Sequence, residues 1–348
     1  MDEARFIAEM ATGPMGRMLA ALWGALWGSF FNVVIARLPE GESLVRPASH
    51  CRGCGASIRW YDNVPVVSYL LLRGRCRRCG ARYSARYLLV ELLVAVLAFL
   101  VHHVYVVSAP APMSLRLAQF FIGSLFCGLL VAIAFIDLDT GLIHNVITYP
   151  GIPVAVLLST FMGPTHLWDG AVGAAGGYLV IRLLADGYRL IRGRLGMGYG
   201  DAKLLALIAG LLGWQSLLPV LFLASMQGSL IGISALLWVR RGRTRRGDQA
   251  APSTANGDSA APSTANGDSA APSTANGDSA APSTVNGDSA APSTANGDSA
   301  GDAEGHDPTG ALTPLRFASM PFGPFLGLAG IEVLLLRAWL AGLLPMFE

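Results

Sequence analysis

The chain has 348 residues, of which 53% are hydrophobic and only 14% charged, and its formal net charge is +2. Its mean hydropathy of +0.48 is far from the balance of apolar and charged residues found in soluble globular domains. This composition excludes an ordinary soluble protein and predicts an all-α polytopic membrane protein, because helices satisfy their own backbone hydrogen bonds in lipid.

The apolar segments predict about eight transmembrane helices. The first runs from about residue 18 to 35 and follows an acidic N-terminal stretch, so we interpret it as a retained helix with its N-terminus outside, not as a cleaved signal peptide. Several runs approach the ~20 residues that cross the hydrocarbon core of a bilayer, and some are shorter. The later runs lie at about 88–107, 115–136, 146–163, 170–185, 203–218, 219–239 and 323–344.

Arginine placement predicts how these helices are oriented. Residues 37–87 contain ten arginines against three acidic residues, so the positive-inside rule places this block in the cytoplasm. Alternating spans then place the loops after 136, around 186–202 and after 239 on the same side. The opposite loops, 108–114 and 164–169, contain no arginine or lysine. Asp137 and Asp201 are therefore expected at the same, cytoplasmic, face.

Near the C-terminus the sequence becomes repetitive. A ten-residue unit, Ala-Pro-Ser-Thr-Ala-Asn-Gly-Asp-Ser-Ala, occurs five times from Ala251 to Ala300, with Val285 as the only deviation. A segment so poor in large apolar side chains predicts a disordered linker. The predicted domains are a first transmembrane helix (1–36), a cytoplasmic domain (37–87), a transmembrane core (88–246), this insert (247–312) and a last transmembrane helix (313–348).

Four of the five cysteines form two pairs in the cytoplasmic block, Cys51 with Cys54 and Cys76 with Cys79. Two pairs of cysteines, each with two residues between its members and separated from each other by 21 residues, are typical of a four-thiolate zinc site, and a cytosolic setting disfavours disulfides. Such a site leaves no open ligand position, so the Zn²⁺ would be structural and the domain zinc-ribbon-like. Redox-active cysteines are the alternative. Cys127 stands alone in an apolar run and is interpreted as a small packing residue.

Two stretches place carboxylates at the edges of apolar runs, where an ionisable residue is a functional candidate. Asp137 ends the run 115–136, and Asp201 follows Gly198 and Gly200 and precedes Lys203, the only lysine of the chain. Alternating glycines let a backbone approach closely, here an extended substrate. The alternative for Asp201 is a helix N-cap. Two further residues of this region are expected to be bystanders: Asp139, facing solvent, and His144, simply hydrogen-bonded.

These stretches resemble the type IV prepilin leader peptidases, and the likeness extends over nearly the whole chain outside the repeats. The first helix carries the segment from Gly28 to Pro39, and the cysteine pairs flank the segment from Asp62 to Leu70. Arg86-Tyr87 and Glu91-Leu92 follow, then both aspartate stretches and the segment from Met320 to Phe325. Gly198-Tyr199-Gly200-Asp201 is also similar to the Gly-x-Gly-Asp signature of presenilin-like intramembrane aspartyl proteases.

The resemblance implies an aspartic endopeptidase of the bacterial cytoplasmic (inner) membrane, with Asp137 and Asp201 as the catalytic pair. It implies cleavage of the short basic leader of type IV prepilins and type II secretion pseudopilins after glycine, at the cytoplasmic face. It further implies N-methylation of the new N-terminus with S-adenosylmethionine. The expected partners are those substrates and the lipid bilayer, with no nucleic acid. One departure is His144, where the family usually has proline.

Two other functions fit parts of the pattern. A proton-coupled membrane carrier would use the same two aspartates as a proton relay, but carriers place such groups near the bilayer midplane and these lie at one edge. A zinc-dependent membrane scaffold would use the aspartates only as helix caps. Cleavage of a prepilin peptide separates both from a protease.

Overall fold

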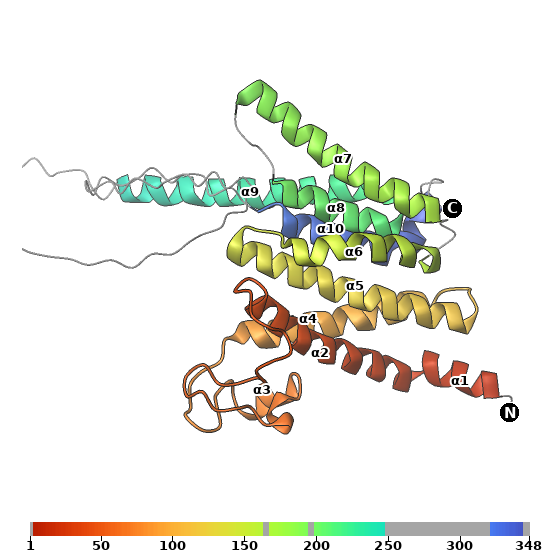
Figure 1. Ribbon diagram of the computed structural model, residues 1–348, viewed down its shortest axis with the longest axis vertical. Helices are drawn as coiled ribbons and strands as arrows, with labels where there is room; N and C mark the ends of the chain where they lie inside the picture. Colours follow the sequence, from red (N-terminus) through yellow and green to blue (C-terminus); the bar gives the residue numbers. More distant parts are fainter. Residues whose placement is uncertain (1–2, 163–166, 194–197, 248–320, 344–348) are drawn as a thin grey trace, which may run out of the picture. The chain divides into compact units, whose positions relative to one another are not determined.

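The computed structural model describes residues 3–162, 167–193, 198–247 and 321–343, and this part of the chain is helical (Figure 1). It contains no strand, only the isolated β-bridges His50–Ser57 and Arg75–Arg82. The α-helices are α1 (Glu3–Thr12), α2 (Pro14–Arg37), α3 (Val67–Leu71), α4 (Ala85–His102), α5 (Met113–Thr140), α6 (Asn145–Leu158), α7 (Leu167–Arg192), α8 (Tyr199–Leu212), α9 (Leu217–Gly247) and α10 (Gly323–Leu343). Four shorter turns join them: η1 (Trp60–Asn63), the π-helical η2 (His103–Val107), η3 (Ser159–Phe161) and η4 (Trp214–Ser216).

Each of the eight expected apolar runs forms a helix within the described residues. Five are long and apolar enough to cross a membrane, namely α2, α4 with η2, α5, α7 and the segment Trp214–Trp238 that contains most of α9. By contrast, α6 and α8 have 14 residues each, about 21 Å at 1.5 Å per residue and so shorter than the ~30 Å hydrocarbon core. The chain is a multi-pass membrane protein.

The long helix α5 connects two groups of helices in the bundle (Figure 1). It packs against α2 and α4, which also pack against each other, and against α10. The short helix α8 packs against α6, α7 and α10. The end of α5 and the start of α8 therefore belong to one helical bundle, although the residues they carry are distant in the sequence.

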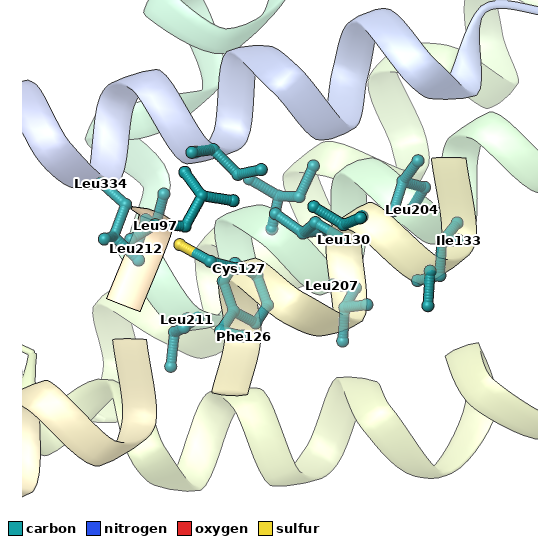
Figure 2. Close-up of a cluster of buried hydrophobic side chains, with 14 of the residues drawn as sticks. Leu97, Phe126, Cys127, Leu130, Ile133, Leu204, Leu207, Leu211, Leu212 and Leu334 are labelled. Carbon is teal, nitrogen blue, oxygen red and sulfur yellow. The ribbon is translucent and has the colours of Figure 1, made fainter. Parts of the chain in front are cut away.

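The core of this bundle is where α5, α8 and α10 meet (Figure 2). Cys127 and Leu130 of α5, Leu207 and Leu211 of α8, and Leu334 of α10 are at most 1% exposed. Cys127 is thus a buried packing residue, as expected from the sequence. Every residue of α8 from Ala202 to Leu212 except Lys203 is buried, which is typical of a helix surrounded by protein on all sides. The start of α8 is therefore held firmly.

Some sequence predictions lie outside the described residues. They include the disordered insert at 247–312, of which only Gly247 is described, and the glycine at position 196 and methionine at position 320. The domain boundaries remain predictions. The described part of the expected cytoplasmic block connects α2 to α4 and contains η1, α3 and both cysteine pairs.

Candidate functional site

Asp137 lies in the last turn of α5 and is only 4% exposed. Its backbone carbonyl accepts a hydrogen bond of 2.8 Å from Gly141 N–H, which ends the helix. The backbone N–H of Gly323 faces its carboxylate, while the Oδ2 atom has no hydrogen-bond partner among the described residues. A buried carboxylate oxygen without a partner is costly and calls for a functional explanation.

Gly323 begins α10 and approaches Asp137 so closely that it has no room for a side chain. A Cβ atom added there would lie 3.1 Å from Asp137 Cγ, closer still to Oδ2, and 3.2 Å from Ile143 Cδ1. Contacts this short between a Cβ and a packed side chain force one of them to move. In the sequence this glycine belongs to the family-like segment from Met320 to Phe325. Its contact with Asp137 was not predicted.

Asp201 lies in the first turn of α8 and is 7% exposed. The N-cap of this helix is Gly198, and no side chain caps it, so the alternative of Asp201 as an N-cap residue is wrong. The helix begins earlier than expected from the apolar run, at Tyr199, and this places Asp201 at the third helical position. Here its carboxylate is near the Gly198 N–H and near the positive end of the helix dipole, which favours an anion.

The fold brings these two carboxylates near one another. Their charges interact. Ile143, in the loop between α5 and α6, packs against Gly200 beside Asp201 and against Gly323 beside Asp137. A Cβ added at Gly200 would lie 3.0 Å from Ile143 Cβ, and Ile143 also packs next to Gly323 beside Asp137. Two neighbouring carboxyl groups can share one proton, so that one acts as an acid while the other acts as a base.

The glycines before Asp201 differ in how tightly they are packed. Gly200 is the tight one, because its added Cβ would press against Ile143, whereas the nearest atom to a Cβ at Gly198 is Asp201 Oδ2 at 3.6 Å, an ordinary contact distance. Gly200 thus lets the start of α8 approach the loop after Asp137. The predicted role of these glycines in admitting a substrate backbone stays a prediction.

Lys203 does not pair with either aspartate. Its Nζ donates a hydrogen bond of 2.6 Å to Asn145 Oδ1 and lies 4.7 Å from the centre of the Tyr149 ring. It therefore links the first turn of α8 to α6. His144 is the N-cap residue of α6, and its buried Nδ1 atom has no hydrogen-bond partner among the described residues, so the expectation that this ring is simply hydrogen-bonded is not met at Nδ1.

A short apolar-walled cavity adjoins Gly323. It measures about 330 Å³ and is lined by Ser225, Gly228 and Ser229 of α9 and by Phe322 and Phe325. Phe322 directly precedes Gly323, which in turn touches Asp137. The cavity is therefore lined by α9 and by residues on both sides of Gly323, the glycine that touches Asp137.

The second candidate site is the group of four cysteines between α2 and α4. Their Sγ atoms all lie within 4.8 Å of one another, and Cys51 Sγ is 3.7 Å from Cys79 Sγ. A tetrahedral Zn²⁺ with Zn–S bonds of ~2.3 Å separates its sulfurs by about 3.8 Å. The four side chains therefore fit a zinc ion, and they form no disulfide.

The two cysteine pairs are built by the same local hydrogen bonds. Cys51 N–H donates to Ala56 O and Gly55 N–H to Cys51 O, and the second pair repeats this with Cys76, Ala81 and Gly80. Both glycines have positive φ angles, 67° and 71°, which only glycine adopts at little cost. Each turn directs backbone N–H groups at a sulfur, as in other anion-binding nests.

These N–H groups favour thiolates at the first cysteine of each pair. The backbone N–H groups of Cys79 and Arg78 lower the pKa of Cys76 to about 6, and those of Gly53 and Cys54 lower the pKa of Cys51. Cys79 accepts a hydrogen bond from Ala81 that favours its thiolate, yet the neighbouring sulfurs, that of Cys54 first, raise its pKa to about 11. Four thiolates at this spacing therefore need a cation between them.

Polar contacts anchor the cysteine region to the helices. Arg77 forms an ion pair of 2.6 Å with Asp62, and this hydrogen-bonded guanidinium lowers the pKa of Asp62. The Val66 N–H donates a 2.7 Å hydrogen bond to the Glu91 carboxylate of α4. The 2.7 Å ion pair between Arg86 and Asp139 links α4 to the end of α5. Asp139 is partly exposed as expected, but it is bound to Arg86 and is not simply solvated.

Comparison with known proteins gives these sites a family. The bacterial peptidase A24 N-terminal domain matches residues 22–105, and the type IV leader peptidase family matches residues 124–233. These two ranges contain all four clustered cysteines and both buried aspartates. No solved structure gives a significant match to the chain.

Several named relatives resemble the chain along most of their length. A prepilin leader peptidase/N-methyltransferase of Myxococcus xanthus (strain DK1622) is 36% identical over 335 residues, covering 96% of this chain and 94% of the relative. Proteins of the same name from Aeromonas hydrophila and Dichelobacter nodosus are 40% and 36% identical, covering 63% and 65% of this chain and 81% and 86% of the relatives. The chain therefore belongs to the type IV leader peptidase family of enzymes.

Proposed function

We propose that this enzyme removes the short basic leader of type IV prepilins and type II secretion pseudopilins after a glycine, and that it N-methylates the new N-terminus. Asp137 and Asp201 are the catalytic pair of the cleavage reaction. The single observation that carries this proposal is the pair itself: two nearly fully buried carboxylates, from the end of α5 and the start of α8, whose neighbouring glycines both pack against Ile143.

The chemistry follows from a proton shared by two carboxyl groups. One ionised carboxylate takes a proton from a water molecule, and the water oxygen then bonds to the scissile carbonyl carbon. The partner carboxyl group donates its proton to the carbonyl oxygen. When the C–N bond breaks, the leaving amine takes up a proton and the pair returns to its starting state, so hydrolysis consumes only the water.

The surroundings of the pair suit a substrate that begins in water and continues into the membrane. Asp137 ends one apolar helix and Asp201 begins another, so both lie at the edge of the apolar bundle. The cavity beside Gly323, lined partly by phenylalanines, offers room for an apolar side chain next to the pair. A prepilin has this form, because its cleavage site precedes a hydrophobic stem.

We place this site at the cytoplasmic face of the bacterial inner membrane. The support is the distribution of arginines: the segment between α2 and α4 is rich in them, whereas the loops 108–114 and 164–169 have none. The same orientation places the cysteines in a reducing compartment, where thiolates bind zinc and do not form disulfides.

Two bound groups accompany this function. A structural Zn²⁺ would be held by Cys51, Cys54, Cys76 and Cys79, whose sulfurs have the required spacing. S-adenosylmethionine, when bound, would supply the methyl group for N-methylation. The support for that second activity is the name shared by the relatives, prepilin leader peptidase/N-methyltransferase.

The test is cleavage of a synthetic prepilin peptide that contains the basic leader, the glycine and the first turns of the hydrophobic stem. Purified enzyme is expected to release the leader at the glycine, and mass spectrometry of the stem fragment is expected to show one added methyl group when S-adenosylmethionine is present. A proton-coupled carrier would leave the peptide intact and acidify vesicles instead. Intact peptide with correctly inserted, zinc-loaded protein would contradict the proposal.

A further inference from the structure

A second cavity is lined by elements other than those that line the cavity beside Gly323. It measures about 470 Å³ and is bounded by the end of α2, the start of α4, the end of α5 and the cysteine region. This size falls within the range of sites that bind small molecules and cofactors. The residues that matter for its chemistry are Asn32, Glu40, Arg52, Arg86, Tyr87 and Asp139.

The wall of this cavity is held together by polar contacts between helices. Asn32 of α2 is only 6% exposed, and its Nδ2 donates a 2.9 Å hydrogen bond to the Tyr87 carbonyl of α4. Arg86 of α4 bridges to α5 through Asp139 and through the Phe135 carbonyl at 3.2 Å. These contacts join α2, α4 and α5 around the cavity, while Arg86 Nε has no hydrogen-bond partner among the described residues.

Two charged side chains of the cavity wall form no such contacts. The Glu40 carboxylate and the Arg52 guanidinium line the cavity, and neither has a hydrogen-bond or ion-pair partner among the described residues. The Glu40 carboxylate can accept hydrogen bonds from an ammonium or from hydroxyl groups. The Arg52 guanidinium can bind a carboxylate with two parallel hydrogen bonds. Tyr87 also lines the cavity, and an aromatic side chain is a group on which a planar base can stack.

We propose that this cavity is the binding site for S-adenosylmethionine, an inference that rests on the proposed methyl transfer. This molecule carries a carboxylate, an ammonium, ribose hydroxyls and a planar adenine, which is the set of groups that Arg52, Glu40 and Tyr87 complement. An anionic lipid headgroup without an ammonium would use the arginine alone and would leave the Glu40 carboxylate facing a phosphate. The opposite charges of the two unpaired groups therefore favour a zwitterionic ligand.

The position of the cavity fits a reaction that follows leader cleavage. Thr140 lines it and lies three residues after Asp137 on α5. Side chains three apart on a helix are neighbours, with Cβ atoms about 5–6 Å apart. Asp137 and Thr140, a residue of the cavity wall, therefore lie within one helical turn of each other on α5.

The methyl transfer itself balances without a further reactant. The neutral amine uses its lone pair to bond to the methyl carbon, while the carbon–sulfur bond breaks and its electron pair stays on sulfur as a thioether. The methylated amine then releases one proton. Glu40 and Ser84 of the wall are exposed, so this proton can leave to solvent.

The test is direct binding of S-adenosylmethionine with a tritiated methyl group to the full-length, zinc-loaded protein in detergent, measured by equilibrium dialysis. The variants are Glu40→Gln and Arg52→Gln. The matched controls are Glu42→Gln and Arg82→Gln, because both residues are exposed charges of the same region that do not line the cavity. Zinc content of each preparation reports that the cysteine region is folded.

We expect the Kd to rise at least tenfold in each cavity variant and less than twofold in each control. S-adenosylhomocysteine is expected to compete with the label, and inorganic phosphate is not. Unchanged affinity in both cavity variants, or equal competition by phosphate, overturns this site while leaving methyl transfer in place. Failure of the wild-type protein both to bind the label and to methylate the cleaved peptide overturns the methyl-transfer part of the proposed function together with this site.

Discussion

The four cysteine sulfurs come from two short segments, 51–54 and 76–79, and each segment is shaped by hydrogen bonds within seven residues of chain. The aspartate pair instead needs the end of α5, the start of α8 and the start of α10, which only the folded bundle brings together. The first site is thus a property of local turns completed by a metal ion. The second is a property of tertiary packing.

This difference predicts that a change which disables one site leaves the other intact. A change in the buried bundle affects the aspartates without disturbing the cysteine turns, and loss of the metal affects the cysteine region first. A polar contact joins the two regions, from the Val66 N–H to Glu91 of α4, and the ion pair of Arg86 with Asp139 joins the start of α4 to the end of α5. The predictions below test that independence, beginning with the largest effect.

Replacing either buried carboxylate is expected to have the greatest consequence. Asp137→Asn and Asp201→Asn should each lower leader cleavage by about 10³-fold or more, because an amide can neither share the proton nor activate water. Zinc content should be unchanged. The measurement is single-turnover cleavage of a prepilin peptide, followed by mass spectrometry. Appreciable cleavage by either variant would falsify the paired mechanism.

Adding one methyl group beside Asp137 is the next test. Gly323→Ala should lower cleavage by about 10²-fold, since the new Cβ overlaps the Asp137 carboxylate and displaces it. Gly327→Ala, one turn further along α10, is the matched control. There the nearest atom to the added Cβ is the Leu130 carbonyl oxygen at 3.5 Å, an ordinary contact. Equal losses of cleavage in the two variants would show that added side-chain volume at either position of α10 lowers activity, whether or not it contacts Asp137.

Features written in neighbouring residues could be predicted from the sequence. Each of the eight apolar runs coincides with a helix of the described residues, and the cysteine spacing located the four clustered sulfurs. The contact between Gly323 and Asp137 could not be foreseen, since no local pattern states which helix start approaches which helix end. The partner of Asp139 was missed for a similar reason, because Arg86 lies on a different helix.

Helix length was also hard to predict from composition alone. The run 203–218 was expected to span the membrane, yet α8 ends at Leu212 and is surrounded by protein. An apolar stretch looks the same in sequence whether its side chains face lipid or other helices. For Asp201 this matters, because the earlier start of α8 places it inside the first turn and not at the cap.

Removing the metal is expected to have an effect confined to the cysteine region. Cys76→Ser should abolish stoichiometric zinc binding, because one of four ligands is lost. Trypsin should then cleave within the arginine-rich segment 52–82 at least tenfold faster. Methylation should fall more than tenfold, whereas leader cleavage should fall less than threefold. A parallel collapse of cleavage would mean that the aspartate pair depends on the zinc-bound fold.

Cys127→Ser provides the control for that experiment, because this cysteine is buried in the helical core and lies outside the cluster. It should leave zinc content and the tryptic pattern unchanged. Any destabilisation it causes should appear in the unfolding of the bundle, since a hydroxyl there would be buried among apolar side chains. The two serine variants therefore separate the two regions by the same chemical change.

The ion pair between the start of α4 and the end of α5 should contribute little energy. Arg86 and Asp139 keep 34% and 44% of their side-chain surface exposed, and ion pairs at such positions contribute about 0.2–1 kcal/mol. A double-mutant cycle with Arg86→Gln and Asp139→Asn, read from thermal unfolding in detergent, should give a coupling energy in that range. Arg86 also packs over the Phe135 ring at 4.7 Å, so the single arginine variant should cost more than the aspartate variant. A coupling well above 2 kcal/mol would mean that the start of α4 and the end of α5 behave as one unit.

Deleting the decapeptide repeats should have the smallest effect on either site. The contacts described for the aspartate pair come from α5, α8, α10 and Ile143, and those of the cysteine centre come from the segments 51–56 and 76–81. If this segment is a flexible connection between α9 and α10, shortening it changes the cost of closing the loop by only about 1 kcal/mol, since that cost grows with the logarithm of length. Cleavage and zinc content should therefore stay within twofold of the full chain. A large loss of cleavage in correctly inserted protein would assign the repeats a part in holding α10, and with it Gly323, against Asp137.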